Sequence, residues 1–270
     1  MLCFPNCKIN IGLYITRKRE DGYHDIETVF YPVQVRDVLE IVPAEKDDMH
    51  ISGLSVSGNL NDNLVWKALQ LLRPVYPDKI TPIDMYLHKV IPMGAGLGGG
   101  SADGAFMLQL LSNYFKLGLS REQLAHYALQ LGSDCPFFIY NTPQFASGRG
   151  EKLSAVSLDL SAYSLQLICP EVHLSTAQAF STIRPKAAPI DLNLLPTIPV
   201  EQWKDKVSND FEQPVFEKHP VLSEIKKQLC GQGAVYASMS GSGSSVYGIF
   251  PKGIKAAIQV DAAFKEFFAA

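Results

Sequence analysis

The chain has 270 residues, of which 47% are hydrophobic and 19% charged, and 24 Lys and Arg against 27 Asp and Glu give a formal charge of −3. This apolar content can bury enough surface to offset the ordering of the chain, which argues against intrinsic disorder. The near balance of charges argues against a basic surface for nucleic acid, so any anionic ligand must be bound by local groups. The length allows one large domain or two packed lobes.

Cysteine usage and hydropathy indicate the compartment. The five cysteines are odd in number, contain no C-x-x-C pair and belong to a chain too long to depend on disulfides. No stretch reaches about 18 uncharged apolar residues, and the first ten residues lack the apolar core of a signal peptide. We therefore expect reduced thiols, a cytoplasmic location and no membrane partner.

The N-terminal quarter reads as strands. Apolar residues alternate with others from Ile9 to Ile15, the pattern of a half-buried strand, and a charged turn over 17–22 ends it. Further strands are expected over 28–34, 38–42 and 51–56. The quarter should therefore be mostly antiparallel sheet.

Helices dominate the next stretch. A helix capped by Asn61–Asn63 is predicted from Leu64 to about Arg73, followed by a strand over 83–90. After a glycine-rich segment, apolar spacing predicts one helix through Tyr114 and another, opened by Ser120, to Leu131.

The character of the chain changes after the turn at 147–150, and a lobe boundary is expected near 150–160. Residues 154–199 contain five prolines and little regular pattern, and the role of the proline-rich segment 181–206 is not predicted. Beyond them we expect a helix over 221–229. Strands are predicted over 165–169, 235–238 and 246–250, the last two flanking a second glycine-serine loop over 240–245.

The segment from Pro92 to Asp103 is the most unusual in the chain. Six glycines between Gly94 and Gly104 allow unusual φ values and let a ligand approach the backbone N–H groups. The helix that follows presents unpaired N–H donors and the positive end of its dipole. Together these features predict an anion site suited to phosphate.

Other interpretations of this segment fit less well. The spacing Gly94-x-Gly96-x-x-Gly99 satisfies the dinucleotide fingerprint, but a second helix follows where that fold needs a strand. A P-loop needs a lysine before its final Ser or Thr, and the tripeptides H-R-D and D-F-G of protein kinases are absent. A flexible linker does not normally join a regular strand to an amphipathic helix.

The loop carries a resemblance to a known family. Pro92–Ser101 resembles the P-x-x-x-G-L-G phosphate loop of the GHMP kinase superfamily, which includes galactokinase, homoserine kinase and mevalonate kinase, and Ser240–Ser245 resembles its C-terminal glycine-rich motif. The resemblance spans nearly the whole chain. It implies a two-lobed α+β GHMP kinase fold. An N-terminal ATP-binding lobe like ribosomal S5 domain 2 would cover 1–152, and a C-terminal, ferredoxin-like substrate lobe would cover 153–270.

Two shorter motifs narrow the resemblance. P-N-C-K-I-N-I over 5–11, with R-E-D-G-Y-H over 19–24 and T-V-F over 28–30, is similar to the branch that phosphorylates a cytidyl diphosphate sugar alcohol. This branch implies transfer of the γ-phosphoryl group of ATP to the tertiary 2-hydroxyl of a methylerythritol group. That step belongs to the non-mevalonate (MEP) route to isoprenoid precursors.

The resemblance also implies roles for single residues. Asp134 matches the catalytic aspartate and Lys8 the lysine beside it; without the resemblance, Asp134 could simply cap the next helix. A lone lysine in an apolar strand is otherwise hard to explain, because lysine is seldom buried unpaired. Since a tertiary alcohol ionises only far above neutral pH, we expect alignment, charge stabilisation and a base that accepts the proton as the P–O bond forms.

Substrate and nucleotide positions follow in the same way. Tyr23, His24 and Phe180 are expected around the cytosine, although alone they would read as a hairpin tip and a core residue. Asn10 matches a residue near the erythritol hydroxyls and Thr176 one near the cytidine. The nucleotide should be bound by Asn63 and Lys89 near the adenine and by the loop residues Pro92, Met93, Gly94, Ala95, Gly96, Leu97, Gly98, Gly99, Gly100, Ser101 and Ala102.

Mg²⁺ is expected with ATP, and Ser101 is its candidate protein ligand. The sequence departs from the family where Ala102 replaces a frequent second serine and Cys7 a frequent alanine. Another superfamily kinase, such as homoserine or mevalonate kinase, is the nearest alternative, and Asp21–His24 argues against it. A nucleotide-binding regulator without catalysis is the other, against which Lys8 and Asp134 argue. The partners should be small molecules, with the chain a monomer or homodimer.

Overall fold

The computed structural model describes residues 1–56, 58–181 and 183–269, without the side chains of 176–178. The chain forms two compact units, each assembled from several segments. Unit 1 comprises Met1–Cys7, Val35–Met93 and Gly98–Thr142, and unit 2 comprises Lys8–Gln34, Gly94–Leu97 and Pro143–Ala270. The boundaries of these units differ from those of the contiguous lobes 1–152 and 153–270, which were predicted as the ATP-binding and substrate-binding lobes and remain a prediction.

Unit 1 contains one four-stranded sheet in the order β1-β4-β6-β5. β1 pairs antiparallel with β4 and β4 with β6, as expected for this region. The pairing of β5 with β6 is parallel, an exception within the mostly antiparallel sheet that the sequence predicts. The four strands are β1 (Leu2–Cys3), β4 (Val38–Pro43), β5 (Asp48–Gly53) and β6 (Ile83–Lys89).

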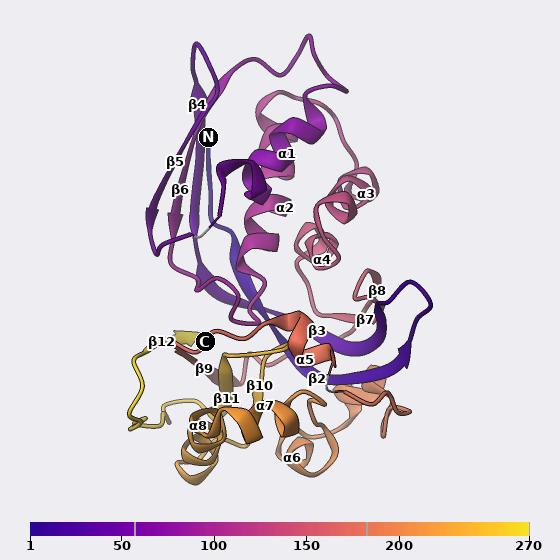
Figure 1. Ribbon diagram of the computed structural model, residues 1–270, viewed down its shortest axis with the longest axis vertical. Helices are drawn as coiled ribbons and strands as arrows, with labels where there is room; N and C mark the ends of the chain where they lie inside the picture. Colours follow the sequence, from indigo (N-terminus) through magenta and orange to yellow (C-terminus); the bar gives the residue numbers. More distant parts are fainter. Residues whose placement is uncertain (57, 182, 270) are drawn as a thin grey trace. The chain divides into compact units, whose positions relative to one another are not determined.

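The four helices of unit 1 lie on one side of this sheet (Figure 1). Asn63 caps α1 by accepting a hydrogen bond of 2.9 Å from Val65 N, and Ser120 and Gln123 form a reciprocal capping box at α3. Both helix starts are therefore confirmed where local side chains predict them. The helices are α1 (Leu64–Leu72), after the short η1 (Leu60–Asp62), then α2 (Gly99–Tyr114), α3 (Arg121–Leu131) and α4 (Cys135–Tyr140).

Unit 2 contains two sheets. The first has the order β2-β3-β7-β8 and is formed by β2 (Asn6–Lys18), β3 (His24–Arg36), β7 (Gln144–Gly148) and β8 (Lys152–Ala155). β2 is buried on both faces from Asn6 to Ile15, so the prediction of a half-buried strand is wrong. The alternation failed because residues such as Asn10 and Tyr14 are also buried by neighbouring elements.

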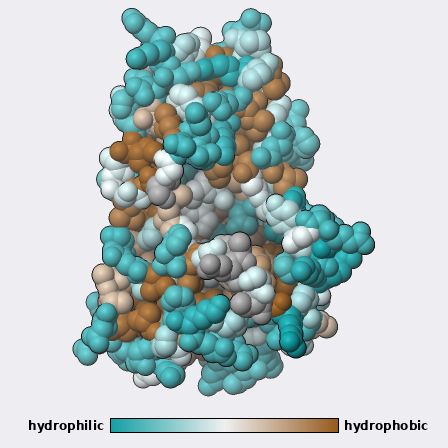
Figure 2. Space-filling model, viewed as in Figure 1, coloured by the Kyte–Doolittle hydropathy of each residue, from teal (hydrophilic) through white to brown (hydrophobic). Residues whose placement is uncertain are grey.

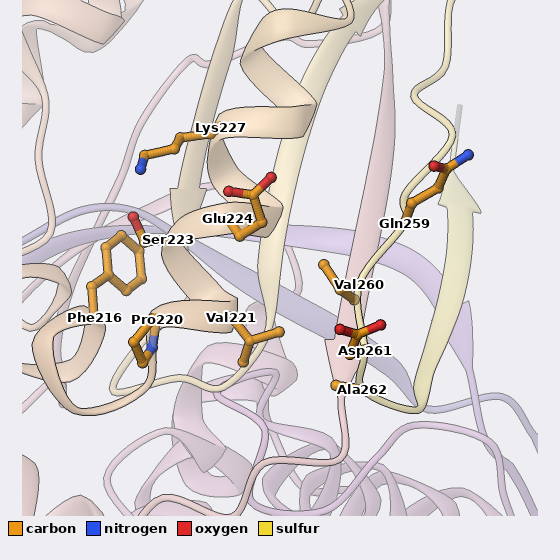
Figure 3. Close-up of a pocket in the computed structure, with 10 residues that line it drawn as sticks. All are labelled: Phe216, Pro220, Val221, Ser223, Glu224, Lys227, Gln259, Val260, Asp261 and Ala262. Carbon is orange, nitrogen blue, oxygen red and sulfur yellow. The ribbon is translucent and has the colours of Figure 1, made fainter.

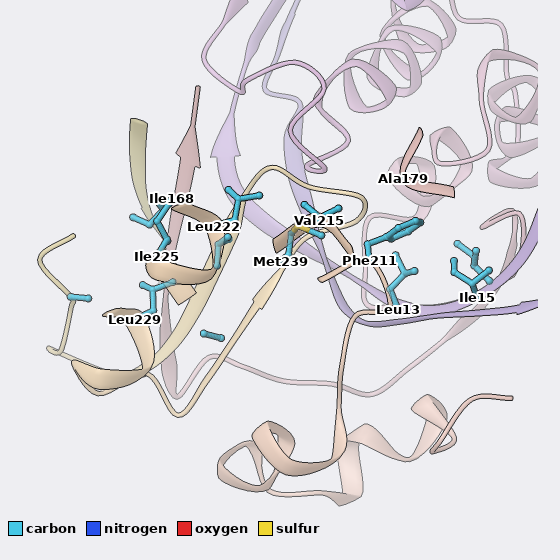
Figure 4. Packing of buried hydrophobic residues seen from close by; sticks show 14 of the residues in the cluster. Leu13, Ile15, Ile168, Ala179, Phe211, Val215, Leu222, Ile225, Leu229 and Met239 are labelled. Carbon is cyan, nitrogen blue, oxygen red and sulfur yellow. The ribbon is translucent and has the colours of Figure 1, made fainter. Parts of the chain in front are cut away.

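The second sheet of unit 2 is antiparallel, in the order β10-β11-β9-β12. Helix α8 packs against β10 and β11, and their apolar side chains join others from β2, β9, α5 and α7 in the core shown in Figure 4. The strands are β9 (Tyr163–Pro170), β10 (Tyr236–Met239), β11 (Val246–Pro251) and the unpredicted β12 (Phe264–Ala269). The helices are α5 (Thr176–Ser181), α6 (Trp203–Lys206), α7 (Glu212–Lys218) and α8 (Pro220–Gly231), with η2 (Leu192–Thr197) and η3 (Val200–Gln202).

The described part of the proline-rich stretch, 183–206, is structured although its sequence has no regular pattern. It contains η2, η3 and α6, and Trp203 is fully buried with its indole N–H donating to Ile198 O at 3.0 Å. The turn between β2 and β3, the indigo loop at the right of Figure 1, is hydrophilic in Figure 2. Among the described residues, no helix has both the length and the apolar character needed to cross a bilayer.

Candidate active site

The glycine-rich loop has a repeating backbone conformation. Gly94, Gly96 and Gly98 have φ values of 66°, 78° and 71°, so every second residue is left-handed. Left-handed residues that alternate in this way let successive N–H groups point to one side, as in backbone nests that bind anions. Gly98 is also the N-cap of α2, a helix of 16 residues that begins with Gly99. The loop therefore leads its N–H donors directly into a helix N-terminus, which suits a phosphate.

Gly96 is required by close packing as well as by φ. A Cβ atom at this position would lie 2.0 Å from the carbonyl oxygen of Ser240, whereas a Cβ on Gly94 would meet nothing within 4 Å. The two glycines thus share a left-handed backbone but differ in the space around them.

Replacing Gly96 by alanine should therefore displace the second glycine-serine loop as well as strain the backbone. Since the loop is predicted to bind the phosphates of ATP, we expect Gly96→Ala to displace its N–H donors and to raise the KM for ATP by about tenfold or more. Gly94→Ala should show only the left-handed penalty of about 1–2 kcal/mol in the free energy of unfolding. Steady-state kinetics and thermal melting test this difference, and equal effects of both substitutions would contradict the packing argument.

Lys8 is buried in β2 and its ammonium faces the glycine-rich loop. Only 3% of the residue is exposed, and Nζ donates to Asn10 Oδ1 at 2.6 Å and to Gly96 O at 3.2 Å. The ammonium also lies 4.9 Å from the centre of the Phe30 ring. The backbone N–H of Lys8 donates to Leu97 O at 2.9 Å, so strand and loop are joined at two points. The structure therefore brings the predicted residues Lys8, Asn10 and Gly96 together.

The second glycine-serine loop completes this arrangement. Ser240 Oγ donates to Gly96 O at 2.8 Å and accepts from Asn10 N at 3.2 Å. The buried Asn209 donates through Nδ2 to the carbonyl oxygens of Met239 and Gly241, both at 2.8 Å, and thereby supports Ser240 from either side. Asn209 was not predicted, because no local pattern around it indicates this role.

Asp134 occupies the N-cap position of α4 but does not act as a cap. Its side chain makes no capping hydrogen bond, and it is only partly buried, directly before the buried Cys135 and Pro136. Burial raises the pKa of the Cys135 thiol to about 12, against the lowering effect of Ser101, so the thiol stays neutral. The alternative interpretation of Asp134 as a helix cap is therefore not supported.

Aromatic residues meet beside the turn between β2 and β3. His24 and Phe180 stack with their ring centres 5.0 Å apart and their planes at 22°. Burial and nearby Lys18 lower the pKa of His24, so its imidazole is neutral at pH 7. Tyr23 is 57% exposed, and the Arg149 guanidinium lies 5.2 Å from its ring centre. The sequence predicts only a turn at 147–150, so a role for Arg149 in this turn was not predicted.

For three of the predicted ligand-binding residues, the described structure gives no support for direct contact with a ligand. The amide oxygen of Asn63 accepts the α1 capping bond, so it has a structural role. Lys89 is 1% exposed and its ammonium is held by Asp37 and by Asp103, which does not favour direct contact with a nucleotide. Thr176 is the first residue of α5, and its side chain lies outside the described part of the chain.

The protein groups near the glycine-rich loop are compatible with a Mg²⁺ ion that is bound mainly by phosphate oxygens. Ser101 lies in the first turn of α2, partly buried, with its hydroxyl in contact with the Cys135 thiol. Within the described ranges, no group of three or more His, Cys, Asp and Glu side chains could hold a metal ion. Mg²⁺ commonly keeps several waters and binds chiefly to substrate phosphates, so a single hydroxyl near the loop is compatible with it.

A separate groove lies in unit 2 between α8 and the segment before β12 (Figure 3). It has a volume of about 680 Å³ and a mixed lining in which Lys227, Glu224 and Asp261 are the charged residues. None of the predicted site residues lines it, so the groove is not part of the candidate active site.

Family models match both halves of the chain. The model described as GHMP kinases N terminal domain matches residues 63–142, and the model described as GHMP kinases C terminal matches residues 200–270. Together they cover the helices of unit 1, the glycine-rich loop and most of the final sheet.

Similar proteins extend over nearly the full length. A 4-diphosphocytidyl-2-C-methyl-D-erythritol kinase of Bacteroides thetaiotaomicron is 52% identical, over 94% of this chain and 93% of the relative. A kinase of the same name from Cytophaga hutchinsonii is 44% identical, over 93% of this chain and 92% of the relative. The crystal structure of a 4-(cytidine 5'-diphospho)-2C-methyl-D-erythritol kinase matches with a TM-score of 0.80 and 28% identity, over 92% of this chain and 90% of that one. The crystal structure of a homoserine kinase from Cytophaga hutchinsonii matches with a TM-score of 0.70 and 14% sequence identity, over 98% of this chain and 94% of that one. At this level of identity the match shows a similar fold alone.

Proposed function

Because this chain belongs to the GHMP kinase family and is a kinase, we propose that it transfers the γ-phosphoryl group of ATP to the 2-hydroxyl of 4-diphosphocytidyl-2-C-methyl-D-erythritol. The sequence identity of 52%, over 94% of the chain, to a relative named for this substrate carries the proposal. The reaction belongs to the MEP route to isoprenoid precursors. The stacked His24 and Phe180, which suit a nucleobase, support the same acceptor.

Transfer consists of one bond formed and one broken. The acceptor oxygen attacks the γ-phosphorus, the bond from that phosphorus to the oxygen of ADP breaks, and the hydroxyl proton passes to Asp134. Proton transfer accompanies P–O bond formation, because the tertiary alcohol does not ionise beforehand at neutral pH. The position of Asp134, partly buried and directly before the buried Cys135 and Pro136, supports the role of base.

Lys8 stabilises the charge that develops on the transferring oxygens. Its contacts with Asn10 Oδ1 and Gly96 O leave it little freedom, so the charge needs no reorientation during the reaction. The loop N–H groups around Gly96 and the N-terminus of α2 bind the phosphates of ATP. Mg²⁺ would be held by these phosphates with Ser101 as the protein ligand, and it would supply screening of the β- and γ-phosphate charge.

Cytosine recognition can be tested with Tyr23. Tyr23 directly precedes the stacked His24 in the chain, and the centre of its exposed ring lies 5.2 Å from the Arg149 guanidinium, so we propose that it covers one face of the base. Loss of a stacking ring costs about 1–3 kcal/mol per base. We therefore expect Tyr23→Ala to raise the KM for the cytidyl substrate by about 5- to 100-fold, with the KM for ATP near wild type.

Steady-state kinetics with each substrate varied in turn measures this effect. Tyr86→Ala is a matched control, because Tyr86 is an exposed tyrosine of β6 in unit 1, and it should change neither KM. An unchanged substrate KM in Tyr23→Ala would remove Tyr23 from the cytosine site.

The acceptor itself is identified by a coupled assay of ADP release. The protein is incubated with MgATP and, separately, with the cytidyl diphosphate sugar alcohol, homoserine or mevalonate. We expect turnover only with the first, and ³¹P NMR should locate the new phosphate on the 2-oxygen. Turnover confined to homoserine or mevalonate would overturn the proposed acceptor, and ATP binding without any turnover would favour a regulator.

A further inference from the structure

A buried cluster of two carboxylates and one ammonium lies in unit 1. Asp37 stands between β3 and β4, Lys89 ends β6, and Asp103 lies in the second turn of α2. Lys89 Nζ contacts Asp37 Oδ2 closely and Asp103 Oδ2 at 2.7 Å, and the three residues are at most 3% exposed. The proposed reaction uses neither carboxylate.

The cluster contacts the chain on both sides of the phosphate loop. Before the loop, Asp37 Oδ1 accepts hydrogen bonds from Val90 N at 2.6 Å and Ile91 N at 2.9 Å. Beyond the loop, Asp103 projects from α2 to the same ammonium. The segments that enter and leave the loop are therefore joined to one buried charge.

The start of α2 confirms how closely these segments approach. A Cβ on Gly99, the first residue of the helix, would lie 2.8 Å from Cγ2 of Ile91 and 3.4 Å from Nζ of Lys89. Gly99 therefore allows the exit of the loop to pack directly on its entry. Little relative movement is possible there without breaking a bond of the cluster or creating a clash.

Stability alone does not explain such a cluster. Burying charges carries a desolvation penalty that their attraction often fails to offset, and apolar side chains of similar volume are frequently as stable. Asp103 Oδ1 is buried without a hydrogen-bond partner among the described atoms, which adds to the penalty. What the cluster provides is a set of directed bonds at defined backbone points, a property that apolar packing lacks.

We propose that Asp37, acting through Lys89 and Asp103, is a positioning residue that holds the two ends of the phosphate loop at the spacing required to bind the triphosphate of ATP. The inference rests on the proposed use of ATP but not on the identity of the acceptor. It also assigns Lys89 an indirect role in nucleotide binding, in place of contact with the adenine.

The test is the affinity for MgATP, measured by isothermal titration calorimetry on the full chain without any acceptor. Asp37→Asn keeps the size of the side chain and an acceptor for Val90 and Ile91 but removes the charge opposite Lys89. We expect its Kd for ATP to rise about 10- to 100-fold, the usual range for losing a supporting contact behind a binding site. Once ATP is saturating, kcat should fall much less.

Asp47→Asn is the matched control. Asp47 accepts from Ile83 N at 3.0 Å and from Arg73 Nη2 at 2.8 Å, so it repeats the same construction at the other end of β6. We expect it to lower the melting temperature while leaving the ATP affinity unchanged. The proposal is overturned if Asp37→Asn lowers the melting temperature without weakening ATP binding, or if Asp47→Asn weakens ATP binding equally.

A measurement on the wild type covers the case in which Asp37→Asn does not fold. Because coupling is reciprocal, ATP binding must stabilise the cluster if the cluster supports ATP binding. Amide hydrogen exchange of Val90 and Ile91 should slow when MgATP is added, and unchanged exchange at saturating ATP overturns the proposal. Failure of wild-type protein to bind ATP would instead refute the proposed function.

Discussion

Asp134→Asn should lower kcat by about 10²- to 10⁴-fold, the range that a positioned general base contributes. The amide has nearly the same size as the carboxylate but cannot accept the hydroxyl proton at neutral pH. Because Asp134 makes no helix cap, its replacement should not shorten α4, and the melting temperature should stay near that of the wild type. Both KM values should change only modestly, since the lost interaction belongs to the transition state.

Rapid-quench kinetics at saturating substrates measures the chemical step directly. Cys135→Ala is the control, because the neighbouring thiol is neutral at pH 7 and should not accept a proton. Its kcat should lie within about twofold of wild type, since a thiol that stays protonated contributes nothing as a base. A kcat for Asp134→Asn within a few-fold of wild type would exclude Asp134 as the base.

Lys8→Met should lower kcat by about 10²- to 10³-fold, because it removes a fixed positive charge from the reacting centre. Methionine fills much of the same volume, so packing within β2 is largely retained. Asn10 Oδ1 loses the ammonium donor, at a cost of about 1–3 kcal/mol for a buried acceptor left without one, whereas Gly96 O keeps the hydroxyl of Ser240 as a donor. Removing a buried charge offsets part of this cost, so the loss of activity should greatly exceed the loss of stability.

Lys226→Met is the matched control for the loss of a paired lysine in unit 2. Lys226 Nζ lies 2.6 Å from Glu212 Oε2, and nothing in the proposed reaction involves it. The kcat of Lys226→Met should equal that of the wild type. For both variants, kcat and the melting temperature are measured and compared with the wild-type values. If Lys8→Met loses activity only in proportion to its melting temperature, Lys8 has a structural role alone.

Local features of the fold were predictable from the sequence. Asn63 and Ser120 lie one residue before the helices they cap, and a capping bond spans only two or three residues. The alternation that predicts β6 and the glycines that precede α2 are local in the same sense. Predictions of this kind need no knowledge of which distant segment packs against them.

The site residues divide along the same line. The family resemblance predicts roles for Lys8, Asp134 and the phosphate loop. Asp37 and Asn209, in contrast, carry no local sequence signal for the contacts that they make. Asp37 contacts Lys89 from 52 residues away, and Asn209 supports residues about 30 positions further along the chain. Arg149 likewise meets Tyr23 only because the turn at 148–150 is brought to the hairpin of β2 and β3.

The sequence by itself determined local backbone features of this protein: where α1 and α3 start, where glycine permits left-handed turns, and which loop offers N–H donors to an anion. These depend on propensities and hydrogen bonds within a few residues. Only the tertiary structure decided that β2 is buried on both faces, that residues 8–34 belong with the C-terminal half, and that one lysine joins both ends of the phosphate loop. Such features arise from contacts between segments far apart in the chain, and no local pattern specifies which partners meet.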